Sequence, residues 1–352
     1  MSSDQRRLRQ KLIGTVKLTI LVTGGAGYIG SQVVLELLEA GEEVVVLDNL
    51  STGFRWLLPD GLVFVQGNVG DAELVDQVLQ KYAIDSIIHL AASIVVPESI
   101  KHPLAYYRNN VINSQTLIEC AVKNGVKQFI FSSTAAVYGS PRSSPVSEGD
   151  PTQPISPYGW SKLMIEVMLS DTDRAHRLPY VALRYFNVAG ADPLGRTGQA
   201  SPEATHLMKV ACQAALKIRD GVNIYGANYP TPDGTGVRDY IHVVDLARCH
   251  LAALDYLRRG GSSQVLNCGY GHGYSVREVI EAVQRIAQNA FETRVVDRRP
   301  GDPPILVAGT TRIGKTLDWR PRFDDLDLIV SHALAWERTL ATRLSRPVSV
   351  VG

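Results

Sequence analysis

Hydrophobic positions along the chain follow two alternating patterns from residue 18 onward. Short, continuous apolar runs recur, and the longer segments between them repeat their apolar positions with the period of a helix. Continuous apolar runs are typical of strands that are buried on both faces of a parallel sheet. The predicted strands are Leu18–Val22, Val44–Leu47, Leu62–Val65, Ile87–Leu90, Phe129–Phe131 and Val181–Leu183, and the predicted helices are Ile29–Ala40, Ala72–Tyr82, Leu104–Asn124 and Tyr158–Arg174. This alternation predicts repeated right-handed βαβ units, and therefore an α/β fold with a doubly wound parallel sheet of the Rossmann type.

The pattern changes after about Asn187, where glycine, proline and aspartate become frequent and the predicted elements become shorter. We therefore divide the chain into a tail at 1–17, a Rossmann domain at 18–187 and a smaller C-terminal α/β substrate domain at 188–345. Some segments of the last part are expected to return to the first domain. Its predicted helices are 203–219, 245–258, 275–289 and 325–340, and Ser275 with Glu278 forms a capping box at the third of them.

Composition and charge are those of an ordinary globular protein. Hydrophobic residues make up 45% of the 352 residues, and the net charge of +1 provides no field that would attract nucleic acid or an anionic membrane. No apolar run reaches the ~18 residues of a membrane helix, and the polar segment 1–17 lacks the apolar stretch of a secretory signal. Four cysteines without CxxC spacing indicate reduced core residues in a cytoplasmic protein, and neither a disulfide framework nor a metal site.

A glycine-rich turn follows the first predicted strand and opens the first predicted helix. The run Thr23–Gly30 satisfies GxxGxxG through Gly24, Gly27 and Gly30, and GxGxxG from Gly25. Such glycines allow a tight turn and let backbone N–H groups and the positive end of a helix approach a pyrophosphate. Because the motif stands between a strand and a helix, it predicts a dinucleotide site and not merely a tight turn.

Two further strand ends add to this prediction. Asp48 closes the second strand, where a carboxylate can accept hydrogen bonds from ribose hydroxyls and would repel a 2′-phosphate, so NAD is favoured over NADP. Arg55 is the nearby cation that weakens this preference. The fourth strand ends in His89–Ala92, whose small residues let a cofactor lie close to the strand ends. We interpret His89 itself as a core residue whose hydrogen bonds are satisfied.

A tyrosine and a lysine one helical turn apart supply the candidate chemistry. Ser156 and Pro157 suit the N-cap and first position of a helix, which places Tyr158 and Lys162 on one face. An ammonium beside a phenol favours the phenolate, so the pair predicts a proton acceptor with a lowered pKa. Thr134, at the end of the fifth strand, could bind the substrate hydroxyl that Tyr158 deprotonates. The same spacing also occurs on ordinary helix surfaces, and only the surrounding motifs favour catalysis.

Together these motifs resemble the extended short-chain dehydrogenase/reductases. The resemblance covers about residues 18–340 and is closest to the UDP-glucose 4-epimerases, also called UDP-galactose 4-epimerases. It depends on the glycine run and on Asp48–Leu50, Tyr107–Asn110, Ser132–Thr134, Tyr158–Lys162, Leu183–Asn187, Asp233–Val243 and Arg298–Asp302.

The resemblance implies an NAD-dependent epimerase that interconverts UDP-glucose and UDP-galactose through a transient 4-keto sugar. Catalysis would use Tyr158 as the base, Lys162 beside it and Thr134 at the 4-oxygen. The implied cofactor-binding residues are Gly24, Gly27, Tyr28, Ile29, Gly30, Asp48, Asn49, Asn68, Val69, Leu90, Ala91, Ala92, Asn109, Ser132, Tyr158, Lys162 and Phe186. The implied substrate-binding residues are Thr134, Tyr158, Asn187, His206, Leu207, Tyr225, Arg238, Arg299 and Asp302.

Arg238 and Arg299 suit a diphosphate because guanidinium groups bind phosphate oxygens in pairs, and Asp302 could accept ribose hydroxyls. A surface ion pair is the alternative for these arginines. His206 replaces the Asn that is usual in the family. Asn68 replaces a common Asp, and Ile94 replaces a common Lys. Leu306 stands where side-chain size appears in the family to govern tolerance of N-acetylated sugars, so the sugar range stays open.

Three other functions share parts of this pattern. A 4,6-dehydratase needs an acidic pair after the active-site threonine, and Ala135 and Ala136 stand there instead. A 4-epimerase of another UDP-sugar (an N-acetylhexosamine, pentose or uronate) stays possible, and a non-catalytic NAD-binding sensor is less favoured because Tyr158 and Lys162 are both present. The resemblance also implies a homodimer that pairs two helices from each subunit, and the apolar faces of Leu104–Asn124 and Tyr158–Arg174 could form that contact.

Overall fold

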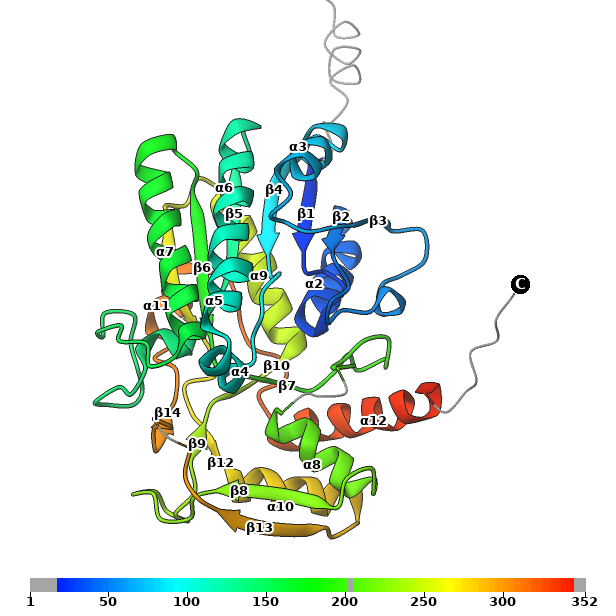
Figure 1. Ribbon diagram of the computed structural model, residues 1–352. Coiled ribbons are helices and arrows are strands. Elements are labelled where there is room, and N and C mark those ends of the chain that lie inside the picture. The colour runs from blue at the N-terminus through cyan, green and yellow to red at the C-terminus, as the bar shows by residue number, and fades with distance from the viewer. Residues whose placement is uncertain (1–17, 202–204, 300, 345–352) are drawn as a thin grey trace, which may run out of the picture.

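The structure is a computed structural model, which describes residues 18–201, 205–299 and 301–344. Its centre is a seven-stranded parallel sheet in the order β11-β6-β5-β4-β1-β2-β3 (Figure 1). The strands are β1 (Thr19–Thr23), β2 (Glu43–Asp48), β3 (Val63–Gln66), β4 (Ile84–His89), β5 (Gln128–Thr134), β6 (Tyr180–Tyr185) and β11 (Gln264–Cys268). The order reverses between β1 and β4, which creates the crevice at the carboxyl ends of the strands where open α/β sheets bind ligands.

Helices cover both faces of this sheet, as the continuous apolar strands require. On one face α2 (Tyr28–Glu39) packs along α9 (Val243–Arg258), and their apolar sides share one core cluster with β1 and β6. On the other face α3 (Ala72–Lys81), α6 (Asn113–Lys123) and α7 (Pro157–His176) pack side by side over a second cluster. The result is the three-layered Rossmann arrangement that the sequence predicted.

A smaller α/β unit lies beneath the carboxyl ends of these strands (Figure 1). Here α8 (Leu207–Ala215), α10 (Val276–Ala287) and α12 (Leu326–Leu344) pack together over the parallel pair β8 (Gly221–Tyr225) and β13 (Glu292–Val296). Two further small sheets join the units. They are formed by β7 (Asn187–Ala189) with β10 (Tyr240–His242), and by β9 (Val237–Arg238) between β12 (Tyr274–Ser275) and β14 (Ile305–Leu306).

The remaining helical segments are short. They are α4 (Val96–Lys101), α5 (Pro103–Tyr106), α11 (Thr311–Thr316), the 3₁₀ turns η1 (Arg55–Leu57) and η3 (Ala135–Tyr138), and the π-helical segment η2 (Tyr107–Ile112).

All six predicted strands are present, and so is the capping box of α10, in which Ser275 accepts from the N–H of Glu278 and the Glu278 carboxylate accepts from the N–H of Ser275. The seventh strand of the sheet, β11, was not predicted. It and α9 follow residue 187 in the chain yet lie against the large sheet, which agrees with the expectation that some segments return to the first domain. The boundary at 187/188 itself stays a prediction, and the predicted tail 1–17 lies outside the described residues.

The predicted helix Leu104–Asn124 is wrong as a single α-helix. The chain forms α5, then the π-helical segment η2, and only then α6. The extra residue that a π turn accommodates brings Asn110 inward, where it is fully buried. Its side-chain amide bonds both backbone groups of Ser93 and the hydroxyl of Ser161 at 2.8–3.0 Å. Apolar periodicity alone cannot predict this polar contact.

Within the part of the chain that the structure describes, no helix combines the length and the apolar content needed to cross a bilayer.

Candidate active site

The glycine turn forms the floor of the crevice. Gly24 has a φ of +72°, and a Cβ there would lie 2.6 Å from the backbone N of Ala91, so the turn and the end of β4 touch through backbone alone. A Cβ on Gly30 would lie 2.1 Å from the carbonyl oxygen of Gly24. Helix α2 therefore begins directly at the turn, and its N-cap, Gly27, offers no side chain to its first N–H groups. These groups can bind an anion such as a pyrophosphate.

Asp48 connects the second strand to this turn. Its buried carboxylate accepts hydrogen bonds from the N–H of Ala26 at 2.9 Å and of Leu50 at 2.8 Å. The chain after it folds back, since the N–H of Phe54 bonds the Ala26 carbonyl at 2.9 Å. Asp48 thus fixes the turn as well as offering oxygens to a ribose. Asn49 caps the next residues by accepting from the N–H of Ser51 at 3.0 Å.

Other predicted cofactor residues lie at the ends of β3 and β4. The Asn68 side-chain oxygen accepts from the N–H of Gly70 at 2.8 Å, and Val69 is in the core. The Leu90 N–H bonds the Thr23 carbonyl at 3.0 Å, which continues the β1–β4 pairing by one residue, and Ala91 and Ala92 follow directly. Asn109 donates to the Ser93 hydroxyl at 3.0 Å. His89 is buried and bonded to Thr23 and Ser114, at 2.7 and 2.8 Å, which confirms it as a satisfied core residue.

The candidate chemistry lies where β5 ends against α7. Ser156 caps α7 by accepting from the N–H of Gly159 at 3.2 Å, and Pro157 occupies the first turn, as predicted. Tyr158 is 7% exposed and Thr134 8%, and the Thr134 hydroxyl lies close enough to the phenol of Tyr158 to lower its pKa. Lys162, 2% exposed, donates to the carbonyl oxygen of Ser132 at 2.8 Å. The structure therefore brings the three predicted catalytic residues together in one buried corner.

The pKa of Tyr158 differs from the sequence prediction. Burial raises it to about 12, and the hydrogen bond with Thr134 opposes that rise. Burial also lowers the pKa of Lys162 to about 7, against the carboxylate of Glu166, which raises it. The prediction of a lowered tyrosine pKa is wrong for the chain alone, because the loss of hydration on burial outweighs the opposing effect of Thr134. A phenolate at neutral pH needs further positive charge.

Two charged residues of this corner were not predicted. Glu166, one turn beyond Lys162 on α7, receives the Arg184 guanidinium on both carboxylate oxygens, with Nε to Oε1 at 2.9 Å and Nη2 to Oε2 at 2.5 Å. Both side chains are at most 7% exposed. The four-residue spacing from Tyr158 through Lys162 to Glu166 was visible in the sequence and could have indicated the glutamate. Its partner on β6 could not be found that way.

Charged and aromatic side chains of the small unit form two pairs among the predicted substrate residues. Arg238 lies on β9, the middle strand of a small sheet, opposite Tyr274 and Leu306. It donates to the Asp302 carboxylate at 2.5 Å. The Arg299 guanidinium lies 3.8 Å from the centroid of the Tyr225 ring. The structure joins these predicted substrate residues as an ion pair and a cation–π pair, with the Arg238 side chain 12% exposed and Arg299 exposed.

The other predicted residues surround this group. Asn187 opens β7, directly after Phe186, which packs with Leu306 and Ala135 in one small apolar cluster. His206 precedes Leu207, the first residue of α8, and its Nδ1 is bonded to the Gln199 amide at 2.7 Å. Burial lowers the pKa of His206, and the nearby charge of Lys209 adds to this effect.

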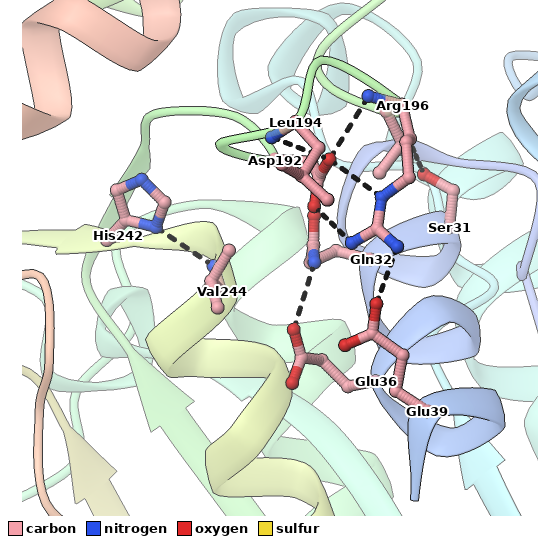
Figure 2. Close-up of polar contacts among 10 residues, drawn as sticks. Ser31, Gln32, Glu36, Glu39, Asp192, Leu194, Arg196, His242 and Val244 are labelled. Atoms are coloured by element: carbon pink, nitrogen blue, oxygen red, sulfur yellow. Dashed lines mark hydrogen bonds and ion pairs between the residues drawn. The ribbon is translucent and has the colours of Figure 1, made fainter. Parts of the chain in front are cut away.

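A loop after β7 ties the small unit to the cofactor helix. The Tyr28 hydroxyl, in the first turn of α2, donates to the Gly190 carbonyl at 2.6 Å, and Ser31 is bonded to Thr197 at 2.5 Å. Figure 2 shows Arg196 between the carboxylates of Asp192, in its own loop, and Glu39, at the far end of α2. The loop after β7 is therefore fixed to α2 by contacts from both ends of that helix.

The comparisons with known proteins agree with this geometry. Residues 20–269 match the NAD dependent epimerase/dehydratase family. A UDP-glucose 4-epimerase of Azospirillum brasilense is 56% identical over 321 residues, which cover 91% of this chain and 92% of that protein. The chain therefore belongs to the NAD dependent epimerase/dehydratase family, among the UDP-glucose 4-epimerases.

Solved structures of similar sequence have the same fold. The UDP-glucose 4-epimerase of Bifidobacterium longum in complex with NAD+ and UDP is 37% identical, with a TM-score of 0.85 over 91% of this chain and 98% of that one. A UDP-Glc/GlcNAc 4-epimerase of Campylobacter jejuni is 45% identical, with a TM-score of 0.81 over 92% and 99% of the two chains.

Proposed function

We propose that this chain is an NAD-dependent epimerase that interconverts UDP-glucose and UDP-galactose through a transient 4-keto sugar. The observation that carries the proposal is the buried corner where the hydroxyls of Tyr158 and Thr134 meet beside Lys162. It lies at the carboxyl end of β5, across the switch point from the glycine turn. Family membership and the UDP-glucose 4-epimerase relatives support the same reaction.

The residues of the crevice fit NAD. The glycine turn and the uncapped start of α2 would hold the pyrophosphate, and Asp48 would accept the adenosine ribose hydroxyls. We assign the other predicted cofactor residues to the walls of the same crevice, with Asn68 on the adenine side and Ser132, Asn109 and Phe186 on the nicotinamide side.

NAD, when bound in this crevice, would supply the hydride acceptor and donor that a reversible oxidation at C4 of the sugar requires. For this to occur, Tyr158 removes the proton of the 4-hydroxyl and Thr134 bonds the 4-oxygen. Lys162 stabilises the phenolate form of Tyr158. The high pKa of Tyr158 in the chain alone means that the positive charge of the oxidised nicotinamide is also needed to favour that form. Tyr158 is therefore expected to act as a base at neutral pH only when the oxidised cofactor is bound.

The small unit would hold the UDP part of the substrate. Arg238 and Arg299 are the diphosphate partners and Asp302 accepts ribose hydroxyls, while Asn187, His206, Leu207 and Tyr225 contact the remaining groups. The Arg238–Asp302 ion pair of the chain alone would have to rearrange as the nucleotide binds. A firm hold on UDP and few contacts to the sugar let the keto sugar rotate between the two hydride transfers.

A 4-epimerase of other UDP-sugars is the second candidate. Leu306 lies opposite Arg238 on β14 and packs beside Phe186, so its size bears on the space next to the substrate diphosphate. A panel of UDP-sugars with and without N-acetyl groups distinguishes the two candidates by their relative kcat/KM.

The proposed function is tested by mixing the purified protein with UDP-galactose and no added cofactor. UDP-glucose should form, because NAD is regenerated in each turnover and stays bound. Protein that contains NAD and produces no UDP-glucose would favour the sensor, and turnover of a different UDP-sugar alone would favour the second candidate.

The homodimer is part of this proposal. Leu104 and Ile112 are 77% and 55% exposed beside α7, on whose outer side Trp160, Met164 and Val167 are 40–54% exposed. Apolar side chains three to four residues apart on adjacent helices suit pairing with a second copy. Light scattering should give twice the chain mass, and Val167→Glu should give a monomer. A monomeric wild-type protein would contradict this part.

A further inference from the structure

The inner face of α7 carries three ionisable side chains at spacings of four residues. Tyr158, Lys162 and Glu166 are 7%, 2% and 4% exposed, and all three point toward β5 and β6. The proposed reaction uses the first two and leaves Glu166 without a role. A carboxylate that is buried this deeply needs a strong reason, because desolvation alone disfavours its charge.

Glu166 is held more rigidly than a simple ion pair requires. Its Oε1 accepts from the Ser133 hydroxyl at 2.5 Å as well as from Arg184, so both neighbouring strands fix its position. The Arg184 guanidinium is held in turn by the Tyr138 hydroxyl at 3.0 Å, and this hydroxyl donates to Asn267 at 2.7 Å. The network therefore joins α7 to β5, β6, β11 and η3.

This network contacts β5 at the residue next to the one that binds the lysine. The carbonyl of Ser132 accepts from the Lys162 ammonium, and the hydroxyl of the next residue, Ser133, donates to the Glu166 carboxylate. Both contacts fix α7 against the same two residues of β5, one residue before Thr134. A shift of Glu166 would therefore move Lys162 relative to the hydroxyls of the site.

Among the ionisable groups around Lys162, Glu166 is the one whose charge favours the ammonium form of the lysine. His89 on β4 is buried and neutral, because burial lowers its pKa to about 3. On β6, burial raises the pKa of Tyr185, so it carries no charge at neutral pH, and Arg184 is itself a cation. Tyr158 is an uncharged phenol until it acts, and Phe131 offers a ring face 4.9 Å from the ammonium.

We propose that Glu166 is a positioning residue for Lys162, which keeps the lysine in place and in its ammonium form, and that Arg184 fixes the carboxylate for this role. Burial lowers the pKa of Lys162 and the Glu166 charge raises it, so removing that charge leaves less ammonium at neutral pH. The inference rests on the proposed function only in assigning catalytic work to Lys162.

The test compares four forms of the full chain with NAD bound. Glu166→Gln removes the charge and keeps the shape. Arg184→Lys keeps the charge of Glu166 and a cation at residue 184 but loses the bidentate contact. It serves as the matched control for lost packing. The double variant Glu166→Gln/Arg184→Gln removes both charges, so that no buried cation is left unpaired if the single variant folds poorly.

Two readouts separate a charge role from a structural one. The first is the titration of the Lys162 side chain, followed by NMR on protein with ¹³C-labelled lysine and assigned from Lys162→Arg. The second is the alkaline limb of kcat/KM against pH. In Glu166→Gln both should move to lower pH by on the order of one unit. The double variant should be more thermally stable than Glu166→Gln, while its Lys162 still titrates at lower pH than in the wild type. Arg184→Lys should be less stable than the wild type, with the midpoints of the lysine titration and of the alkaline limb unchanged.

An unchanged lysine titration in Glu166→Gln and in the double variant would overturn the inference and leave the pair a structural one. Activity that falls equally at every pH, in proportion to lost stability, would also overturn it. If the wild type turns over no UDP-sugar while the titration shifts as expected, the proposed function fails and the role of Glu166 stands.

Discussion

The corner that performs the chemistry and the surface that would hold UDP are built differently. Tyr158, Lys162 and Thr134 are at most 8% exposed, on a strand end and a helix that several buried hydrogen bonds join. Across the crevice, the side chain of Asp302 is 33% exposed and Tyr225 38%, and the charges there pair with one another. The side chains of the chemistry corner are already fixed in place in the chain alone, whereas the UDP surface is arranged so that a charged ligand can replace its internal contacts.

The difference follows from what each region has to do. A proton acceptor beside a nicotinamide gains from a dry, fixed site, where each charge has a large effect. A diphosphate has to enter and leave, so its partners must be accessible and neutralised when it is absent. Variants in the chemistry corner should therefore lower kcat, and variants on the UDP surface should mainly raise KM.

The largest effect is expected from Tyr158→Phe. Removing the hydroxyl removes the proton acceptor and leaves the ring packing intact, so kcat for UDP-galactose should fall roughly 10³-fold, within the range for general bases. The NAD content of the purified protein should match the wild type. Steady-state assays and the absorbance of the released nucleotide measure both, and an unchanged kcat would remove Tyr158 as the base.

A smaller and different effect is expected from Arg238→Met. Loss of a charge-assisted contact with the diphosphate should raise KM on the order of 100-fold with a much smaller change in kcat. The neighbouring Arg298, whose guanidinium lies 4.1 Å from the centroid of the Tyr229 ring, offers a matched control, since Arg298→Met should change KM only slightly. A loss confined to kcat would contradict the division between the two regions.

Thr134→Val should reduce kcat about tenfold. The substitution keeps the shape of the side chain and removes the hydroxyl that bonds Tyr158 and accepts from the N–H of Ala136 at 3.1 Å. Thr134→Ser, which retains the hydroxyl, should be nearly as active as the wild type. Equal losses in both variants would show that the methyl group, and not the hydroxyl, matters at this position.

Acid should weaken the scaffold beneath the chemistry corner. Burial lowers the pKa of His89 to about 3 and that of His250 to about 4, below the usual value near 6.5. Between the lowered pKa values and about 6.5, the unfolded chain therefore binds more protons than the folded chain. The free energy of unfolding consequently falls as the pH drops below about 6.5. The slope is at most about 1.4 kcal/mol per pH unit for each histidine. Urea unfolding at pH 7 and 5.5 measures it, and His250→Gln should flatten the dependence.

The sequence was sufficient for most of the chemistry corner because its signals are local. The glycine turn, Asp48 and the spacing of Tyr158 and Lys162 follow from backbone geometry and helical period, and the structure brings these residues to one edge of the sheet. Their roles as binding and catalytic residues stay proposals.

What the sequence could not supply depends on contacts between distant segments. The edge strand β11 pairs with β6 only after the chain has passed through the small unit. The π-helical segment places the side-chain amide of Asn110 where it bonds Ser161 on another helix. The Glu166–Arg184 ion pair likewise joins residues on different elements. The raised pKa of Tyr158 results from burial, whose extent no residue spacing reveals.

The central claim is that the C4 hydrogen of the sugar leaves as a hydride and returns to the same carbon, with Tyr158 handling only the hydroxyl proton. UDP-galactose that carries deuterium at C4 tests it directly, with the product examined by mass spectrometry and NMR after turnover in ordinary water. We predict UDP-glucose that retains the deuterium at C4. Product with hydrogen from the solvent at C4 would contradict the account.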